Sequence, residues 1–502
     1  MDTEIELKIL VPADANQIIV SSYLPTLQAN IEHKSLTLYN SYYDTADNAL
    51  RKLDMGFRVR GCNGEFEQTI KTAGQSVAGL HQRPEYNVNL PDNQPQLHLF
   101  DPALWPGDMN VEQLQEELEV VFTTHFQREA YLIGFENGNQ IELVFDLGKV
   151  SAGSHEQSIC EIELELKAGD AQCLFDIAEQ LFQLMPCRLG FQSKAARGYM
   201  LAKGLELNPL DNSKSVNLSQ QDNVEQAFIK SVSFVLNWWQ HHEQCYVSTK
   251  NEAALLGIQT AIRMLGQVLR MYQPLLGLSE LQSLIHKSDA IEKKWQWVTE
   301  FYGLVTLSSE RGSFRKLHEK NDQLLSFLNG RAQGMLLSHQ PMCLIDNENA
   351  ARLQLALLKL LTSKPWLQTS DQWHQPIKAV CRQVLSDGLY QVSQLMTGGS
   401  PFDAEQYKES EALLRNVLFN GVFFANLFAD NGREQFRAPW LDILDGIEEL
   451  QMLSQLQHEI RRSDLEEKDE LVTWVQDKTA RLLSIMEQSR GAALDMQPYW
   501  ED

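Results

Sequence analysis

Polar and apolar residues alternate with a period of two in several short stretches of the first 204 residues. The clearest examples are residues 4–9, 57–60 and 161–166, where charged and apolar side chains take turns. Successive side chains of a β-strand point to opposite faces, so this pattern predicts strands with one apolar and one ionised face. The first part of the chain is therefore expected to consist mainly of strands.

Turn and helix signals divide these strands. The Asn-Gly pairs at 63–64 and 137–138 lie between alternating stretches, and Asn-Gly favours the positive φ angles of tight hairpin turns. Antiparallel pairing is expected at both places. Three stretches combine helical spacing with few β-branched residues, namely 13–29, 111–118 and 171–185. They predict a few helices beside the sheet.

The periodicity changes after residue 204. A polar stretch containing a proline follows, and we assign residues 205–216 as a linker. From about residue 222 to residue 490 the apolar residues recur with a period of 3.6, which predicts either one helical bundle or two successive bundles broken near 335–348. The predicted fold class is α+β followed by all-α, with domains at 1–204 and 217–490.

Composition and charge narrow the function classes. The chain has 502 residues, and 43 Lys and Arg against 67 Asp and Glu give a formal net charge of −24. No domain-wide basic surface is available, which argues against a nucleic-acid partner. Seven widely spaced cysteines without a Cys-x-x-Cys pair indicate neither a disulfide framework nor a zinc site. We find no secretion signal or membrane span, and we expect a cytoplasmic protein.

Like charges cluster on the charged faces of the predicted strands. Glu4 and Glu6 share a face, Arg58 and Arg60 share another, and residues 161–165 place three glutamates on a further face. An ordinary solvent-facing sheet would intersperse the two signs, because neighbouring like charges repel. Carboxylate clusters suit Mg²⁺ or Mn²⁺, and guanidinium groups suit phosphate oxygens. The pattern therefore predicts metal-dependent chemistry on a phosphate chain.

The ordered set of charged motifs over residues 1–202 resembles the CYTH superfamily of triphosphate tunnel metalloenzymes. The opening Glu4-x-Glu6-x-Lys8 is similar to the family's N-terminal signature. The motifs that follow in family order are Arg58-x-Arg60, Thr69-x-Lys71, Arg83-x-Glu85, Arg128, Asp146, Glu161-x-Glu163-x-Glu165 and Ser193-Lys194-x-x-Arg197-Gly198. The resemblance implies an eight-stranded antiparallel β tunnel with outer helices, whose charged side chains point into the lumen.

The resemblance also implies an activity and a site. We expect hydrolysis of inorganic triphosphate to pyrophosphate and phosphate, with Mg²⁺ or Mn²⁺ as the cofactor. The substrate-binding cations are expected to be Arg58, Arg60, Lys71, Arg83, Arg128, Lys194 and Arg197. The metal ligands are expected among Glu4, Glu6, Asp146, Glu161, Glu163 and Glu165, and which two of the last three glutamates bind metal is left open. Lys8, with Glu4 and Glu6, is assigned to catalysis.

Three alternatives accompany this assignment. The same scaffold serves class IV adenylate cyclases and organic triphosphatases such as those acting on thiamine triphosphate, and a base pocket at one tunnel mouth would favour either. A non-catalytic scaffold that binds polyphosphate is the third, although binding alone needs cations more than carboxylates. Glu67 is expected to have a structural role, pairing with an arginine across its hairpin.

The helical part resembles the CHAD domain, a helical module often found after a CYTH domain. The basic positions of that family are largely replaced here, with Leu256, Gln259 and Gly266 around the remaining Arg263, and Ala412 before the remaining Arg415. We expect weak polyphosphate binding or none. His241 and His242 are adjacent on a predicted helix and point about 100° apart, so a shared metal site is not expected.

Overall fold

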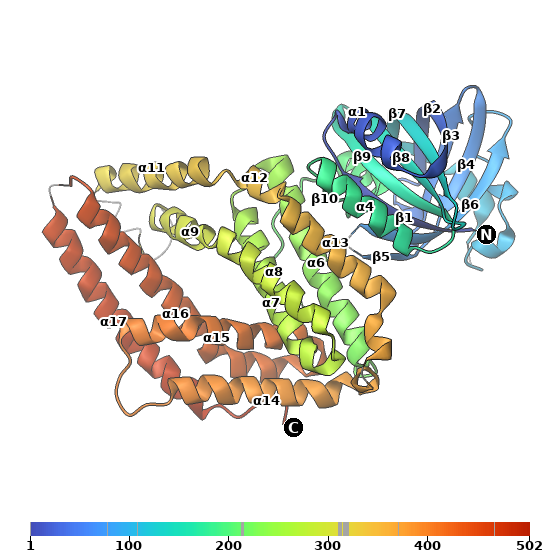
Figure 1. Ribbon diagram of the computed structural model, residues 1–502. Coiled ribbons are helices and arrows are strands. Elements are labelled where there is room, and N and C mark those ends of the chain that lie inside the picture. The colour runs from blue at the N-terminus through green and yellow to red at the C-terminus, as the bar shows by residue number, and fades with distance from the viewer. Residues whose placement is uncertain are drawn as a thin grey trace. The chain divides into compact units, whose positions relative to one another are not determined.

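The computed structural model describes residues 2–77, 79–107, 109–211, 215–309, 314, 321–369, 371–465 and 467–501. Part of the predicted linker, residues 212–214, therefore lies outside the described residues, as do 310–313, 315–320, 370 and 466 of the predicted helical domain. The chain forms two compact units, one of residues 1–208, 247–250 and 345–363, and one of the remaining segments. Figure 1 labels their elements.

The first unit is built around a closed ring of eight antiparallel strands, which confirms the predicted tunnel. Going round the ring, each strand pairs with the next, and the last pairs with the first. The order is β1 (Asp2–Leu10), β9 (His155–Ala168), β8 (Gln140–Ala152), β7 (Glu119–Phe135), β2 (Ala29–Asp44), β3 (Gly56–Cys62), β4 (Glu65–Lys71) and β6 (Leu80–Leu90). Closure leaves no open edge within the ring.

Two short strands extend this sheet outside the ring. β10 (Arg188–Leu189) pairs with the end of β1, and β5 (Gln75–Val77) pairs with β6. Both predicted hairpins are present. Asn63 and Gly64 have φ of 50° and 87° between β3 and β4. In the longer loop between β7 and β8, Gly138 has a φ of 86°, while Asn137 does not adopt a positive φ.

The outward faces of the strands carry the apolar residues, and short helices cover part of them. Val59 of β3 and Ile162 of β9 are buried, as the alternating pattern predicts. The predicted helical stretches are confirmed in outline, since they contain α1 (Ala15–Ile18) with the short turns η1 (Ile19–Tyr23) and η2 (Leu24–Thr26), α3 (Val111–Glu116) and α4 (Gln172–Leu184). The remaining helices among the described residues up to 208 are α2 (Ala49–Lys52), α5 (Lys194–Ala202) and the turns η3 (Leu97–Leu99) and η4 (Pro102–Leu104).

One helix from the later part of the chain belongs to the first unit. α13 (Glu348–Ser363) packs against α4 and β10. Arg188 Nε lies 3.2 Å from an Asp346 carboxylate oxygen, and Lys359 Nζ lies 3.2 Å from an Asp176 oxygen. The unit that contains the tunnel is therefore completed by residues far beyond the predicted limit at 204. The limits of the domains as predicted remain a prediction.

The second unit is all-helical, as predicted. Its long helices bury leucine-rich stripes, such as that of α7 with Leu255, Ile262 and Leu269. The helices are α6 (Val224–Thr249), α7 (Ala253–Leu276), α8 (Ser279–Trp295), α9 (Trp297–Leu307), α11 (Asp322–His339), α12 (Pro341–Ile345), α14 (Ile377–Met396), α15 (Ala404–Phe423), α16 (Asp430–Arg462) and α17 (Lys468–Asp495), with turns η5 (Pro365–Gln368), η6 (Gln372–His374) and η7 (Ala425–Leu427). None of the helices in the described part of the chain is long and apolar enough to cross a bilayer.

Candidate functional site

A cavity of about 270 Å³ lies inside the strand ring and is lined mainly by ionisable side chains. Alternation along each strand accounts for this lining, because the apolar residues face outward and the charged ones face in. Most of the predicted site residues line it, namely Glu4, Glu6, Lys8, Arg58, Arg60, Lys71, Arg83, Arg128, Glu163, Glu165 and Lys194. Asp146, Glu161 and Arg197 are not among the lining residues. Asp146 and Glu161 contact the lining residue Lys194, and Arg197 contacts Glu161 behind it.

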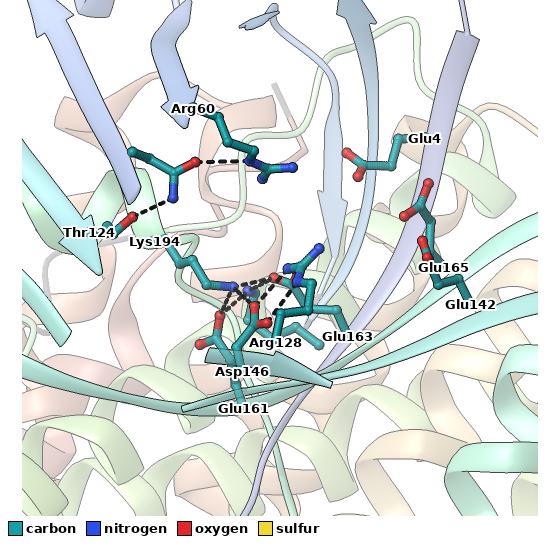
Figure 2. A network of polar contacts seen from close by, with 12 residues as sticks. Glu4, Arg60, Thr124, Arg128, Glu142, Asp146, Glu161, Glu163, Glu165 and Lys194 are labelled. Atoms are coloured by element: carbon teal, nitrogen blue, oxygen red, sulfur yellow. Dashed lines mark hydrogen bonds and ion pairs between the residues drawn. The ribbon is translucent and has the colours of Figure 1, made fainter. Parts of the chain in front are cut away.

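One wall of the cavity carries a tight acidic cluster. Carboxylate oxygens of Asp146 (β8), Glu161 and Glu163 (β9) lie within 4.8 Å of one another. Lys194, the first residue of α5, places its Nζ 2.7 Å from Asp146, 2.6 Å from Glu161 and 3.0 Å from Glu163 (Figure 2). The cluster could hold a cation, and an ammonium group already lies among its oxygens.

Further cations surround the same cluster. Lys8 contacts Glu161 at 2.7 Å and also contacts Glu163. Arg128 donates two hydrogen bonds of 2.7 Å to the Asp146 carboxylate and one of 3.0 Å to Glu163. Burial by itself would raise the pKa of Glu161, but Lys194 and Lys8 outweigh it and lower that pKa to about 2. Glu161 is thus ionised, and cations are in contact with every carboxylate of the cluster.

A second acidic group is less well neutralised. Figure 2 shows Glu4, Glu165 and Glu142 on one side of the view, apart from the first cluster. Burial raises the pKa of Glu4 to about 7 against the attraction of Lys71, and burial also raises the pKa of Glu165. Lys167 contacts Glu142 at 3.0 Å and Glu165 at 2.6 Å. A divalent cation would relieve more repulsion here than in the first cluster.

Arg60 differs from most cations of the cavity. Among the described residues, no carboxylate oxygen lies within 4.0 Å of its guanidinium nitrogens, whereas Arg58 lies 3.5 Å from Glu85. Glu67 is directly opposite Arg60 in the β3–β4 pairing, but the ion pair expected across this hairpin is not formed. Burial and the nearby Arg58 guanidinium lower the pKa of Arg60. Its positive charge is therefore available for an anion in the cavity.

Arg83 is similar to Arg60 in one respect. It lines the cavity, and in the part of the chain that the structure describes it too has no carboxylate oxygen within 4.0 Å. Both arginines belong to the predicted phosphate-binding set. The cavity thus offers cations without a fixed counter-ion next to carboxylates without full neutralisation.

Lys8 is held from its backbone as well as from its side chain. Its N–H donates to Gly79 O at 2.9 Å, and its carbonyl accepts from Gly190 N at 3.0 Å. Gly190 follows β10, and a Cβ atom placed there would lie 2.9 Å from Lys8 Cγ. The absence of a side chain at 190 is therefore what lets the lysine stem pass along the wall.

Several residues that line the cavity are absent from the predicted set. They are polar or aromatic and include Tyr42, Arg51, His81, Asn87, Glu142 and Lys167. Glu142 shares the inward face with Asp146 at a spacing of four, which period two indicates, but the pattern alone does not distinguish a lumen residue from a solvated one. Asn40 and Thr124 are also absent from that set, although both are polar and buried.

These observations define a closed antiparallel β tunnel with an ionised lumen. Residues 2–199 match the family model of the CYTH domain, and this segment of the chain is a CYTH domain. An inorganic triphosphatase of Haemophilus influenzae is 41% identical over 199 residues, which are 39% of this chain and 54% of that relative. The match thus spans about half the length of that relative.

Two solved structures are also similar. One is a putative adenylyl cyclase of Hippeastrum described as having a dominant triphosphatase activity, 17% identical, covering 41% of this chain and 97% of that chain with a TM-score of 0.31. The other is the CHAD domain of the plant Ricinus communis, 14% identical, covering 57% of this chain and 96% of that chain with a TM-score of 0.43.

The polar candidates of the helical unit have internal partners. Arg263 lies 3.3 Å from Glu292, and Arg415 lies 2.8 Å from Glu411 and 3.0 Å from Glu448. Both arginines that remain of the resembled basic motif are therefore already paired with carboxylates.

The histidine pair is accounted for by ordinary contacts. His242 places Nδ1 2.8 Å from Trp238 O, and its Nε2 accepts from Leu210 N at 3.1 Å. With both ring nitrogens engaged, His242 is a structural residue.

Proposed function

We propose that the tunnel hydrolyses inorganic triphosphate to pyrophosphate and phosphate with Mg²⁺ or Mn²⁺. The observation that carries this proposal is the Arg60 guanidinium, which has no carboxylate partner among the described residues. Across the lumen lie three carboxylates, Glu4, Glu142 and Glu165, contacted by two lysines, Lys71 and Lys167. An elongated polyanion that brings its own divalent cation satisfies both sides together. The 41% identity to the Haemophilus influenzae inorganic triphosphatase supports the same substrate.

The proposed division of work follows the charges. The cations that bind and align the phosphates are Arg58, Arg60, Lys71, Arg83, Arg128, Lys194 and Arg197. The carboxylates that hold metal are proposed among Glu4, Glu6, Asp146, Glu161, Glu163 and Glu165, whose oxygen donors fit Mg²⁺ and Mn²⁺. A bound divalent ion supplies charge stabilisation of the phosphoryl group and orientation of water. The cations supply preorganised stabilisation of the charge that develops on the phosphate oxygens.

Lys8 is assigned an electrostatic role in this proposal. A general base would need a depressed pKa. Burial tends to lower the pKa of Lys8, but Glu161 and Glu163 outweigh it and raise that pKa well above its ordinary value. Lys8 is therefore protonated, and we propose that it keeps Glu161 and Glu163 in place and balances their charge.

The aromatic residues of the cavity favour a small inorganic substrate over a nucleotide. The Phe126 ring has the Lys194 ammonium 5.2 Å from its centroid and the Arg128 guanidinium 5.6 Å away. Tyr199 lies beneath Arg51, and Tyr42 stacks on Phe122. Apart from His81, the aromatic rings among the described lining residues are Phe126, Tyr199 and Tyr42. Each of these three rings is already in contact with another group and is therefore less available to stack on a base. This arrangement disfavours the adenylate cyclase and thiamine triphosphatase alternatives.

The test is phosphate release from four substrates, each with and without Mg²⁺ or Mn²⁺: triphosphate, ATP, thiamine triphosphate and long-chain polyphosphate. We expect metal-dependent release that is fastest with triphosphate. Faster turnover of ATP or thiamine triphosphate would identify that compound, and not inorganic triphosphate, as the substrate. Binding of triphosphate without any phosphate release would favour the scaffold alternative.

Two further expectations belong to this proposal. The helical unit is proposed to bind polyphosphate weakly or not at all, since Arg263 and Arg415 are paired internally. A cytoplasmic site of action is proposed because the seven cysteines are widely spaced and include no Cys-x-x-Cys pair, so the sequence indicates no disulfide framework.

A further inference from the structure

Asn40 lies between Arg60 and Thr124 in the tunnel wall. Arg60 Nε donates to Asn40 Oδ1 at 2.9 Å, and Asn40 Nδ2 donates to Thr124 Oγ1 at 2.9 Å. Asn40 is 2% exposed and Thr124 is fully buried. Figure 2 shows Arg60 and Thr124 at the two ends of this short chain of contacts.

The strand register places the three residues in one row. β2 lies between β3 and β7, and Asn40 is directly opposite Arg60 on one side and Thr124 on the other. The amide orientation is set by its neighbours, because a guanidinium can only donate and therefore requires the carboxamide oxygen. Thr124 then accepts from the remaining NH₂ group. The amide is held at both ends, so it can fix the direction of the Arg60 side chain.

The neutrality of Asn40 is the informative property. Arg128, on a neighbouring wall, is held by the Asp146 carboxylate through two hydrogen bonds, so its charge is largely compensated within the protein. Arg60 is held by a group of the same size that carries no charge. A carboxylate at position 40 would orient Arg60 equally well but would neutralise it before any substrate arrives.

We infer that Asn40 is a positioning residue for triphosphate binding, which orients the Arg60 guanidinium toward the lumen while leaving its charge uncompensated. This role rests on the proposed function. The neutral amide, which is hydrogen-bonded to Thr124, is then required for strong binding of phosphate by Arg60 and not for the fold alone.

The main test compares three variants in steady-state triphosphate hydrolysis by the full-length protein. Asn40→Asp keeps size and acceptor but adds charge, and we expect KM to rise at least about tenfold with kcat changed less than about threefold. Asn40→Leu keeps size and removes the acceptor, and KM is expected to rise about three- to tenfold because Arg60 is no longer held. Asn420→Asp places the same change in a buried amide of the helical unit and should leave KM unchanged.

Two controls separate the positioning of Arg60 from a direct effect of charge on the substrate. Simple repulsion of phosphate by a new carboxylate would raise KM in Asn40→Asp and leave it unchanged in Asn40→Leu, which would overturn the inference. In an Arg60→Ala background, Asn40→Leu should produce no further rise in KM, since its effect acts through Arg60. An equal rise in both backgrounds would also overturn it.

The outcomes distinguish this inference from the proposed function. If the parent protein does not hydrolyse triphosphate, the proposed function fails first. If the parent is active and both Asn40 variants keep the parental KM, the positioning role fails while the function stands. Should Asn40→Asp not fold, Thr124→Val replaces it, because it frees the amide without adding charge. That variant should raise KM about twofold or more, and a parental KM would contradict the role.

Discussion

The ammonium of Lys8 lies 2.7 Å from a carboxylate oxygen of Glu161, although 153 residues separate the two in the chain. The contact joins β1 to β9, which are neighbours in the ring. It places a permanent cation beside carboxylates that are proposed to bind metal. A metal entering the Asp146 cluster must compete with Lys8 and Lys194, and a metal at the Glu4 group must compete with Lys71 and Lys167.

Removing a single proposed metal ligand should greatly reduce turnover. Glu6→Gln and Glu163→Gln each keep side-chain volume and remove one negative charge, so kcat for triphosphate is expected to fall at least about 10²-fold with the fold intact. Glu156→Gln, an exposed change on the same strand as Glu163, is the matched control. Near-parental metal-dependent rates in both site variants would show that the ligands are misassigned.

Truncating the arginine pair should weaken substrate binding. Arg58→Ala and Arg60→Ala each remove a guanidinium that faces the lumen, and charge-assisted contacts of this kind contribute more than exposed ion pairs. We expect a KM at least about tenfold higher, with Arg481→Ala, an exposed residue of α17, as the control. Calorimetric titration with triphosphate checks binding directly, and parental affinity in both variants would exclude this cationic wall.

A methyl group at position 190 should disturb Lys8. Gly190→Ala would place its Cβ 2.9 Å from Lys8 Cγ, which is closer than ordinary van der Waals contact. We expect destabilisation of about 1–3 kcal/mol and a clear loss of kcat, because Lys8 must move away from Glu161. Gly134→Ala is a suitable control, since its nearest neighbour is an atom 3.9 Å away. Thermal unfolding and turnover measured together would detect both effects, and unchanged kcat would separate Lys8 from the chemistry.

Acid should destabilise the tunnel over a pH range that depends partly on the protonation of Glu85. Burial alone would raise the pKa of Glu85, but Lys71 at 3.3 Å and Arg58 at 3.5 Å lower it to about 2. The stabilisation is therefore complete above about pH 4.5 and is lost as the pH falls toward 2, and it amounts to at most about 3 kcal/mol.

Glu85→Gln lacks this contribution. The difference in unfolding free energy between parent and variant should accordingly be largest near neutral pH and shrink below pH 4.5. Denaturant unfolding in a chelating buffer at several pH values measures it, and a difference that does not depend on pH would refute the assignment.

Separating the two parts of the chain should leave the chemistry with the first. A fragment of residues 1–204 contains every residue assigned to metal or phosphate, so it should hydrolyse triphosphate in a metal-dependent way, while a fragment of residues 217–490 should not. The first fragment lacks α13, and it should melt below the full chain. Assays of both purified fragments test this, and hydrolysis by the helical fragment would place the site in the other part of the chain.

The sequence could predict which residues line the lumen because strand alternation is local. Glu4, Glu6 and Lys8 must share a face once the segment is a strand, and the ring then brings that face inward. Local pattern cannot state which strands pair across a closed ring, so it does not predict the approach of Lys8 to Glu161. It also cannot show that Asn40 hydrogen-bonds to both Arg60 and Thr124, since an isolated buried amide carries no periodic signal. The packing of α13 on α4 is not predicted either, because a local pattern does not state which distant element a helix contacts.

The position of α13 affects how the protein is made. A ribosome that has completed residues 1–208, which include the eight strands of the ring, has still to translate residues 209–363 before the helix that covers α4 exists. At about 5–20 residues per second, this takes roughly 10–30 s. During that interval the side of α4 that later contacts α13 is exposed to solvent and to any chaperone bound near the ribosome. The order of synthesis therefore makes the N-terminal domain depend, for its last packed surface, on a segment translated much later.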